Sequence, residues 1–505
     1  MPESQARNFF LRKRSLSPRQ GWLLLALLWV GVTLVDRAWL YIDTSVPSWD
    51  PADYLRGTLV FWHALQDPQW LSGEWWHDFW TLRTKTPPLT YTAGALAQLV
   101  AGPGADRAMW AMTAFDGVLL AATFGLGWTL ASVETGLWAA TLTVLMPGLY
   151  RMRLEFWQDF PLVAMVTLGF LSLSYWRSTG ERQSTQQRSL WPELLGAIGV
   201  SLTLGLALLT KQTALFFLAV PMLWLGVGDI VRRRWGRLGQ LAGAIAVSAI
   251  VWWPWYSSNW FLMVTAGKRA TIDSAAIEGD PSLASLDAWT FYARVLPHSV
   301  SWPLLAVPVV GWLGYSYWQW RERRSPVRLD PQVGWLLVFL LGGYLLATLN
   351  VNKDSRYILP LLPGLAVWLA IGLTRWGRQL GGRQVRWSLA ALSIGLAWVH
   401  LFPIVPAGSL DTWSGWGIPF RATRTAWPHP QAIDAAIAAE PYLRSTIGVL
   451  PSTSDVNQHN INYYGGLQDF QVYGRQVGVK QRDLNQDARS LHWFVTKTGD
   501  QGSIP

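Results

Sequence analysis

Apolar runs long enough to cross a lipid bilayer recur along this sequence. A helix of roughly 17–25 apolar residues spans a hydrocarbon core about 30 Å thick. Only 14% of the 505 residues are charged, whereas a soluble chain carries about a quarter. The sequence therefore predicts an all-α polytopic membrane protein with about eleven spans. The expected spans are 21–41, 109–131, 136–150, 160–176, 194–210, 213–228, 238–256, 302–320, 333–349, 357–374 and 387–405.

Segment 87–103 is also apolar, but it is expected to lie in the interface or re-enter the membrane. It begins with two prolines and ends at Gly102-Pro103-Gly104, which are signals of a short helix between turns. The stretch after Asp50 has apolar residues at helical spacing and predicts a second interfacial helix. The first outer loop is thus expected to carry interfacial helices.

Basic residues gather on one side of the expected spans. The tail 1–20 and four later inner loops carry 20 of the 41 lysines and arginines. The positive-inside rule therefore places the N-terminus in the cytoplasm and the C-terminus outside. If 87–103 were a full span, every later loop would change sides and this pattern would be lost. The four inner loops are 177–188, 232–237, 321–328 and 375–386.

The predicted topology divides the chain into a basic cytoplasmic tail, a membrane domain and a C-terminal outer domain. The runs at 445–453 and 493–496 are typical of strands, and 432–443 is typical of an amphipathic helix, so the outer domain is expected to be small and α/β. The boundaries are 1–20 for the tail, 21–405 for the membrane domain with large outer loops at 42–108 and 257–301, and 406–505 for the outer domain.

Composition excludes several kinds of site. The sequence has no cysteine, which excludes disulfides, iron–sulfur clusters and thiolate metal sites. The net charge of +10 sits in the inner loops, so it does not indicate a nucleic-acid partner. No HExxH motif or phosphate-binding glycine loop occurs, and His63, His77 and His298 are expected at the interface. The 35 tryptophans suit membrane interfaces, and their faces also stack on sugar rings.

The stretch SWDPADY, residues 48–54, places Asp50 at the outer end of the first span. Asp50 has the pattern of a helix N-cap, with Pro51 at the first helical position and Asp53 at the third. A carboxylate at the outer face is also a candidate general base. The residue pattern leaves both roles open, and they are compatible.

Lysines interrupt apolar stretches at two further outer positions. Lys85 lies in TKTPPLTY, residues 84–91, where two prolines force an extended turn. It is either a snorkelling anchor or a cation for a phosphate group. Lys211 separates two apolar runs in LLTKQT, residues 208–213, and a lysine at the membrane edge is a functional candidate.

Carboxylates and an Arg-Tyr pair mark two more outer junctions. Glu155 and Asp159 are four residues apart and share one face if their segment is helical. Arg151 and Arg153 could instead neutralise both as a salt-bridged cap. Residues 356–363, RYILPLLP, open a span with two prolines, which can expose backbone groups to a cavity.

Taken in order, these motifs resemble the GT-C membrane glycosyltransferases, in the branch of protein O-mannosyltransferases and bacterial aminoarabinose transferases. The resemblance covers about residues 21–405. WDPADY is similar to the family's Asp-Glu-x-x-Tyr motif, with Asp50 and Tyr54 matching and Pro51 replacing the second acid. Lys85 to Leu89 resembles the Lys-Pro-Pro-Leu motif with one extra residue.

Three later positions also match the family pattern. Asp159 precedes an apolar span, Lys211 follows a Leu-Thr pair, and Arg356 to Pro360 reads Arg-Tyr-x-Leu-Pro. The family has a re-entrant or interfacial segment after the Pro-Pro motif, which agrees with the expectation for 87–103.

The resemblance implies transfer of a sugar, with inversion, from a polyprenyl-phosphate donor to a lipid, glycan or protein acceptor. Lysine and arginine can stabilise a monophosphate leaving group, so the transfer is expected to need no metal or other cofactor. It implies that Asp50 is the base and Asp159 a supporting carboxylate. The reaction would take place on the outer, periplasmic side of the plasma (inner) membrane. The residues expected to bind the donor and its phosphate are Lys85, Lys211, Arg356, Tyr54, Tyr357 and Glu155.

Two other kinds of protein remain as alternatives. A transporter or lipid-linked glycan flippase could use the same charges, although such proteins usually show paired inverted halves with broken helices, and none is evident here. A non-catalytic scaffold for envelope assembly would tolerate loss of the carboxylates.

Overall fold

The computed structural model describes residues 16–185, 191–323, 330–376, 381–402, 420–479 and 481–502. Most of the predicted basic tail lies outside the described residues. The same holds for parts of three arginine-rich loops and for the beginning of the predicted outer domain. Those segments are 1–15, 186–190, 324–329, 377–380 and 403–419.

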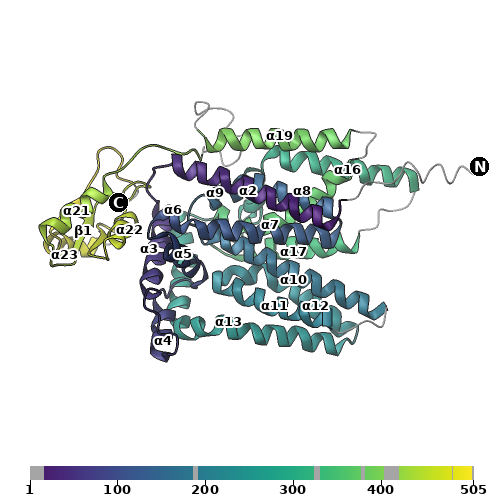
Figure 1. The fold of residues 1–505 in the computed structure, drawn as a ribbon, viewed down its shortest axis with the longest axis horizontal. Helices are drawn as coiled ribbons and strands as arrows, with labels where there is room; N and C mark the ends of the chain where they lie inside the picture. The colour runs from purple at the N-terminus through teal and green to yellow at the C-terminus, as the bar shows by residue number, and fades with distance from the viewer. Residues whose placement is uncertain are drawn as a thin grey trace, which may run out of the picture.

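A bundle of long helices forms the body of the molecule, and the C-terminal domain lies at one end of it (Figure 1). We call this the domain end and the opposite one the far end. Within the described residues, eight helical stretches are long and apolar enough to cross a membrane. They are α2 (Pro18–Ile42), α6 (Ala105–Ala108) with α7 (Trp110–Leu130), α10 (Asp159–Thr185), α11 (Trp191–Thr210), η1 (Gln212–Ala214) with α12 (Leu215–Val231), α13 (Trp235–Lys268), α17 (Pro331–Leu349), and η3 (Ser355–Leu361) with α18 (Leu362–Thr374).

The other three expected spans are not among these eight stretches, so the number of eleven spans stays a prediction. The run 136–150 is divided, because Pro147 starts a new helix, and leaves the 13-residue α8 (Val133–Leu145) before α9 (Pro147–Arg153). Helix α16 (Trp302–Arg323) meets α15 (Leu286–Val300) at 103°. Ser301, with φ +80°, makes that bend. Helix α19 (Gly382–Leu401) occupies the last expected span.

The first loop carries short helices, as predicted. They are α3 (Trp49–Ala64), α4 (Gly73–Thr81) and α5 (Leu89–Ala101). Helix α5 begins after two prolines and ends at Gly102, whose φ of +88° is the left-handed geometry that favours glycine at a helix end. Its 13 residues are too few to span a bilayer.

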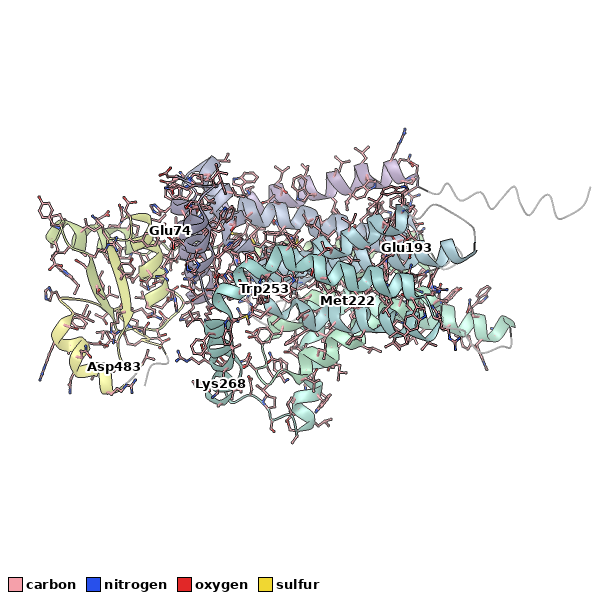
Figure 2. All side chains as sticks on the ribbon, turned by 90° about the horizontal axis from the view of Figure 1, so that it is seen from below. Glu74, Glu193, Met222, Trp253, Lys268 and Asp483 are labelled. Carbon is pink, nitrogen blue, oxygen red and sulfur yellow. The ribbon has the colours of Figure 1, made fainter. Side chains whose placement is uncertain are left out.

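The expected outer loop 257–301 is mostly helical. Helix α13 continues to Lys268, well past the predicted end at residue 256, because only Pro254 interrupts its sequence and the helix passes through it. A π-helical turn, η2 (Arg269–Asp273), and α14 (Ser274–Glu278) follow. In Figure 2, Lys268 lies at the domain end of the bundle, to one side of it, while Trp253 and Met222 lie along the bundle.

A buried ion triad joins three helices inside the bundle. The Arg153 side chain is 4% exposed, and its Nε lies 2.6 Å from Asp36 Oδ2. Its Nη1 lies 3.7 Å from Asp116 Oδ1. Asp36 belongs to α2, Asp116 to α7 and Arg153 to α9. The alternative in which Arg153 neutralises Glu155 or Asp159 is therefore wrong, because its charge is used by the bundle.

The C-terminal domain is α/β, as predicted. Its parallel sheet has the order β2-β1-β3. The expected strands at 445–453 and 493–496 are β1 and β3, and β2 was missed. The elements are α21 (His429–Ala439), β1 (Ser445–Val449), α22 (Gln458–Leu467), β2 (Val472–Gln476), η5 (Gln481–Asp483), α23 (Leu484–Ser490) and β3 (Trp493–Val495).

Helix α22 docks the domain on α3 of the first loop. Tyr463 of α22 is buried in the same apolar cluster as the membrane helices. A Cβ at Gly466 would lie 3.1 Å from a methyl group of Leu59 on α3, so the two helices approach closely. The domain thus continues the core of the bundle.

Replacing Arg153 by leucine is expected to destabilise the bundle by about 3–5 kcal/mol, because it leaves two buried carboxylates without a counter-charge. The measurement is thermal unfolding of the purified protein in detergent. The triple change Arg153→Leu, Asp36→Leu and Asp116→Leu should recover much of the loss. An Arg153→Leu protein as stable as the wild type would contradict this account of the triad.

Candidate active site

Asp50 and Arg356 face each other at the domain end of the bundle. Asp50 lies in the first turn of α3, with its side chain 49% exposed, and Arg356 lies in η3. Arg356 Nη1 is 3.3 Å from Asp50 Oδ2, and its Nε donates to Asp354 Oδ2 at 2.8 Å. The Trp157 ring lies 4.3 Å from the guanidinium carbon. Arg356 is thus fixed on three sides and orients Asp50.

The predicted N-cap role of Asp50 is wrong. Helix α3 begins at Trp49, and its N-cap is Ser48, whose side chain makes no capping hydrogen bond. Asp50 and Pro51 are the second and third helical residues, positions where a proline costs no intrahelical hydrogen bond. The Asp50 carboxylate still benefits from the positive end of the helix dipole. Since it does not cap the helix, it is available to Arg356 and to a ligand.

Asp159 and Lys211 form a second pair, deeper in the bundle. The Asp159 side chain is 2% exposed, and Lys211 Nζ lies 2.7 Å from its Oδ1. Lys211 Nζ also lies 5.6 Å from the centre of the Tyr357 ring. Asp159 begins α10 and Lys211 precedes η1, so the pair ties the start of α10 to the turn between α11 and η1. Asp159 Oδ2 is buried without a hydrogen-bond partner among the described residues.

Tyr54 lies near both carboxylates. Its ring centre is 6.3 Å from those of Tyr91 and Trp157. Burial, and then the charges of Asp50 and Asp159, raise the pKa of Tyr54 well above its ordinary value. Its phenol therefore stays protonated and can donate a hydrogen bond at physiological pH.

Glu155 does not share a helical face with Asp159. Residues 154–156 form a turn between α9 and α10, and Asp159 only begins the second helix. Trp157 Nε1 donates to Glu155 Oε2 at 2.8 Å. Burial raises the pKa of Glu155 despite this bond. Glu155 lines a separate cavity of about 120 Å³ beside Asp43 and Asp106.

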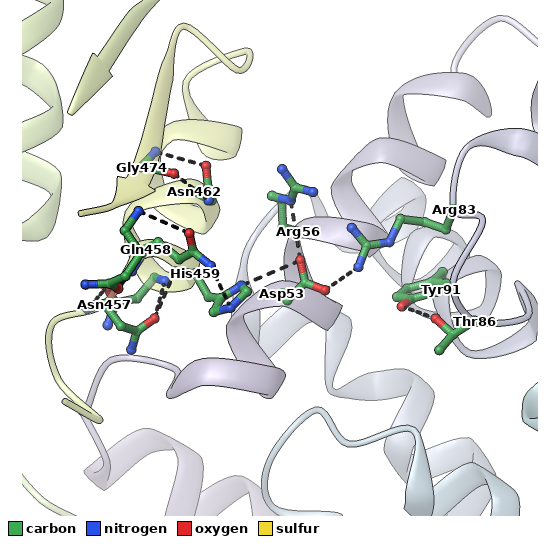
Figure 3. A network of polar contacts seen from close by, with 12 residues as sticks. Asp53, Arg56, Arg83, Thr86, Tyr91, Asn457, Gln458, His459, Asn462 and Gly474 are labelled. Atoms are coloured by element: carbon green, nitrogen blue, oxygen red, sulfur yellow. Dashed lines mark hydrogen bonds and ion pairs between the residues drawn. The ribbon is translucent and has the colours of Figure 1, made fainter. Parts of the chain in front are cut away.

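Asp53, which follows Asp50 by one turn, anchors the C-terminal domain to the first loop (Figure 3). It forms an ion pair with Arg83, and its Oδ1 lies 3.8 Å from His459 Nδ1 and 3.7 Å from Arg56 Nε. Burial alone would raise the pKa of Asp53, but His459 and the charge of Arg83 hold it well below its usual range. Asp53 is therefore a structural ion at this junction.

Lys85 is the lysine of the TKTPPLTY stretch in the first loop. Its side chain is exposed and lines a hollow of about 400 Å³ together with Arg269. Neither cation has an ion-pair partner among the described residues. Thr84, Thr265 and Ser274 line the same hollow and add hydroxyl groups. The hydroxyl groups of Thr265 and Ser274 already donate to backbone carbonyl groups. The hollow therefore offers a ligand mainly its two positive charges.

The structure thus brings together Asp50, Tyr54, Asp159, Lys211, Arg356 and Tyr357. Glu155 adjoins this group through Trp157, which donates to Glu155 and lies against Arg356. Lys85 instead lines the hollow that contains Arg269. Sequence reasoning missed Asp354, Arg83, His459 and Arg269. Asp354 stands two residues before Arg356, which is a detectable signal, because that spacing lets a carboxylate reach both the backbone and the guanidinium group. The other three meet their partners only through the fold.

Chemically, this arrangement provides an exposed carboxylate, an oriented cation next to it and a hollow with two unpaired cations. No group of three or more His, Asp or Glu side chains in the described part of the chain could hold a metal ion. A carboxylate can accept a proton, and paired cations can stabilise a phosphate. These groups suit the transfer of a group away from a phosphate.

Comparison with known proteins gives one family and several similar folds. Residues 22–266 match the family described as dolichyl-phosphate-mannose-protein mannosyltransferase. ArnT from Cupriavidus metallidurans in its apo state is similar, with TM-score 0.57 and 14% identity over 95% of this chain and 90% of that one. No curated protein sequence matches this chain.

Two further solved structures show the same kind of fold. ArnT from Cupriavidus metallidurans bound to undecaprenyl phosphate has TM-score 0.53 and 16% identity over 93% of this chain and 89% of that chain. The oligosaccharyltransferase of Archaeoglobus fulgidus in complex with zinc and sulfate has TM-score 0.52 and 13% identity, over 86% of this chain and 61% of that chain.

Asp53→Asn is expected to loosen the junction of the C-terminal domain, because Arg83 and His459 both lose their charged partner. The measurement is hydrogen exchange of α3 and α22, which should become faster. Because the pKa of Asp53 is lowered, its contribution to stability is present above the ordinary value of about 3.9 and is lost only as the pH falls below it. The exposed Asp67→Asn is the control, and equal exchange in both variants would contradict the role of Asp53.

Proposed function

This chain is a membrane glycosyltransferase of the GT-C type, and from that premise we propose that it transfers a sugar from a polyprenyl-phosphate donor to an acceptor hydroxyl group, with Asp50 as the general base. The observation that carries the proposal is the position of Asp50. It is the half-exposed carboxylate of the cluster and is oriented by Arg356. A base must reach the acceptor, and the deeply buried Asp159 is already paired with Lys211.

The reaction needs a base on one side of the sugar and positive charge on the other. Asp50 takes the proton of the acceptor hydroxyl as its oxygen attacks the anomeric carbon, and the bond to the lipid phosphate breaks. Attack from the side opposite the leaving phosphate inverts the anomeric centre. Negative charge grows on the phosphate in the transition state, so nearby cations accelerate its departure.

We assign the donor phosphate to Lys85 and Arg269. Both line the hollow beside α13, whereas Lys211 and Arg356 already pair with carboxylates. In this proposal, Asp159 and Asp50 are held in place by four neighbouring side chains, those of Lys211, Arg356, Tyr54 and Tyr357. Two cations are enough for a monophosphate leaving group, which is why we propose that transfer needs no metal. The role of Glu155 toward the donor stays a prediction.

A polyprenyl-phosphate donor is supported by the similar fold of ArnT, which has been solved with undecaprenyl phosphate. The hollow also lies beside exposed apolar residues of α13, among them Trp260, Phe261 and Leu262. A lipid tail can pack on such a surface while its phosphate meets Lys85. The acceptor would be a lipid, a glycan or a protein with a free hydroxyl group.

We further propose that the domain end faces the outside of the plasma (inner) membrane. Arginines gather at the far end, at Arg177, Arg232, Arg233, Arg234 and Arg237. The positive-inside rule puts that end in the cytoplasm. Asp50 and the C-terminal domain then lie on the outer side.

Asp50→Asn is expected to lower the transfer rate by about 10²–10⁴-fold, because an amide cannot accept the acceptor's proton. The measurement is sugar transfer from a polyprenyl-phosphate sugar in proteoliposomes. Thermal unfolding should stay close to that of the wild type, and the exposed Asp78→Asn should transfer normally. Normal transfer by a folded Asp50→Asn protein would exclude Asp50 as the base.

Lys85→Ala and Arg269→Ala are each expected to raise the KM for the donor by about tenfold to a hundredfold, since each removes a charged contact to phosphate worth about 1.5–3 kcal/mol. The KM for the acceptor should change little. Lys268→Ala is the matched control, because Lys268 precedes Arg269 and does not line the hollow. If all three variants keep the wild-type donor KM, the phosphate site lies elsewhere.

A further inference from the structure

A second basic cavity lies at the far end of the bundle, between the ends of α10 and α12 and the start of α13. It has a volume of about 290 Å³. Glu193, whose carboxylate pairs with one of its arginines, is labelled at this end in Figure 2. The side chains with charge in its lining are Arg177, Glu181, Asp229, Arg232, Arg234 and Arg237. None of them takes part in the proposed transfer.

Two of the four arginines are already neutralised and form the walls. Arg237 Nη1 lies 2.6 Å from Glu193 Oε1, and its Nε lies 3.4 Å from Asp229 Oδ2. Arg177 Nε lies 3.2 Å from Glu181 Oε1. These pairs give the cavity a fixed shape without giving it a net charge.

Arg232 and Arg234 supply the unpaired charge. Neither has a carboxylate partner among the described residues, and both follow directly after α12 in the turn to α13. Between them, Arg233 has a φ of +56°, in the left-handed region, and it does not line the cavity. Guanidinium groups present several donors in a plane and bind phosphate oxygens in pairs. The cavity is therefore suited to a phosphate.

The wall toward α12 is apolar and exposed. Trp224 is 62%, Val227 58% and Val231 76% exposed, and they follow one another at helical spacing. Large apolar side chains exposed on a membrane-spanning helix face lipid tails. A phosphate carried on acyl chains would thus find cations and an apolar track in one place, whereas a free phosphate would use only the cations.

We propose that this cavity binds the headgroup of an anionic phospholipid from the leaflet at the far end. The headgroup phosphate sits between Arg232 and Arg234, and one acyl chain runs along Trp224, Val227 and Val231. Basic pockets between membrane helices are a known physical basis for such binding. The bound lipid holds the turn between α12 and α13. This inference is independent of the proposed sugar transfer.

The experiment uses the full chain, purified and delipidated in detergent. Phosphatidylglycerol, phosphatidylcholine or inorganic phosphate is added, and bound lipid is measured by native mass spectrometry alongside the Tm. Phosphatidylglycerol should bind and raise the Tm, because a ligand that binds the folded state stabilises it. Equal protection by phosphatidylcholine or by inorganic phosphate would overturn the proposal.

Two matched variants make the test specific. Arg232→Gln with Arg234→Gln should reduce retained phosphatidylglycerol at least tenfold and abolish the rise in Tm. Arg321→Gln with Arg383→Gln removes two exposed arginines from other helices at the same end and should bind like the wild type. An equal loss of retained phosphatidylglycerol in both double variants would show nonspecific attraction between charges and would contradict the proposed site.

A third variant covers the case in which the glutamine variant does not fold. Arg232→Lys with Arg234→Lys keeps both charges but loses the planar donors, and it should keep part of the binding. Removal of the apolar track by Trp224→Ser should also lower retention of phosphatidylglycerol. Unchanged retention in the Trp224→Ser protein would contradict the acyl-chain part of the proposal.

Discussion

The pairing of buried charge governs this structure, and the Arg153 triad shows it most directly. Arg153 joins α9 to α2 and α7 through Asp36 and Asp116, in a region where an isolated ion would be very costly. The three side chains hold α9 against α2 and α7, and with α9 they hold the turn that leads to Asp159.

At the domain end, the pairing of charges also distinguishes side chains that hold the structure together from side chains that can bind a ligand. Lys211 is paired with Asp159, Arg356 with Asp354 and Asp50, and Arg83 with Asp53. Only groups that keep exposure or lack a partner can serve a ligand without first breaking a pair. Asp50 keeps exposure, and Lys85 and Arg269 lack a partner within the described chain. This difference is the reason for proposing Asp50 as the base and Lys85 with Arg269 as the phosphate site.

Much of the fold could be predicted from local patterns. The long helices, the short helix 89–101 between its prolines and Gly102, and two of the three strands follow from periodicity and turn residues. The expectation for Asp50 as an N-cap was wrong because Ser48 takes that position. The shared face of Glu155 and Asp159 was wrong because a turn separates α9 from α10. Both errors concern helix boundaries, where a change of one residue alters the direction of a side chain.

The sequence by itself determined that the chain is a helical membrane protein with a small α/β domain, and it singled out Asp50, Asp159, Lys211 and Arg356. Apolar length and charge distribution are local properties, so they can be read along the chain. Only the tertiary structure decided which charges pair, because Asp159 meets Lys211 from 52 positions away and Asp50 meets Arg356 from 306 positions away. It also placed Lys85 of the first loop beside Arg269. Helix α13 extends to Lys268, and Arg269 follows it directly in η2.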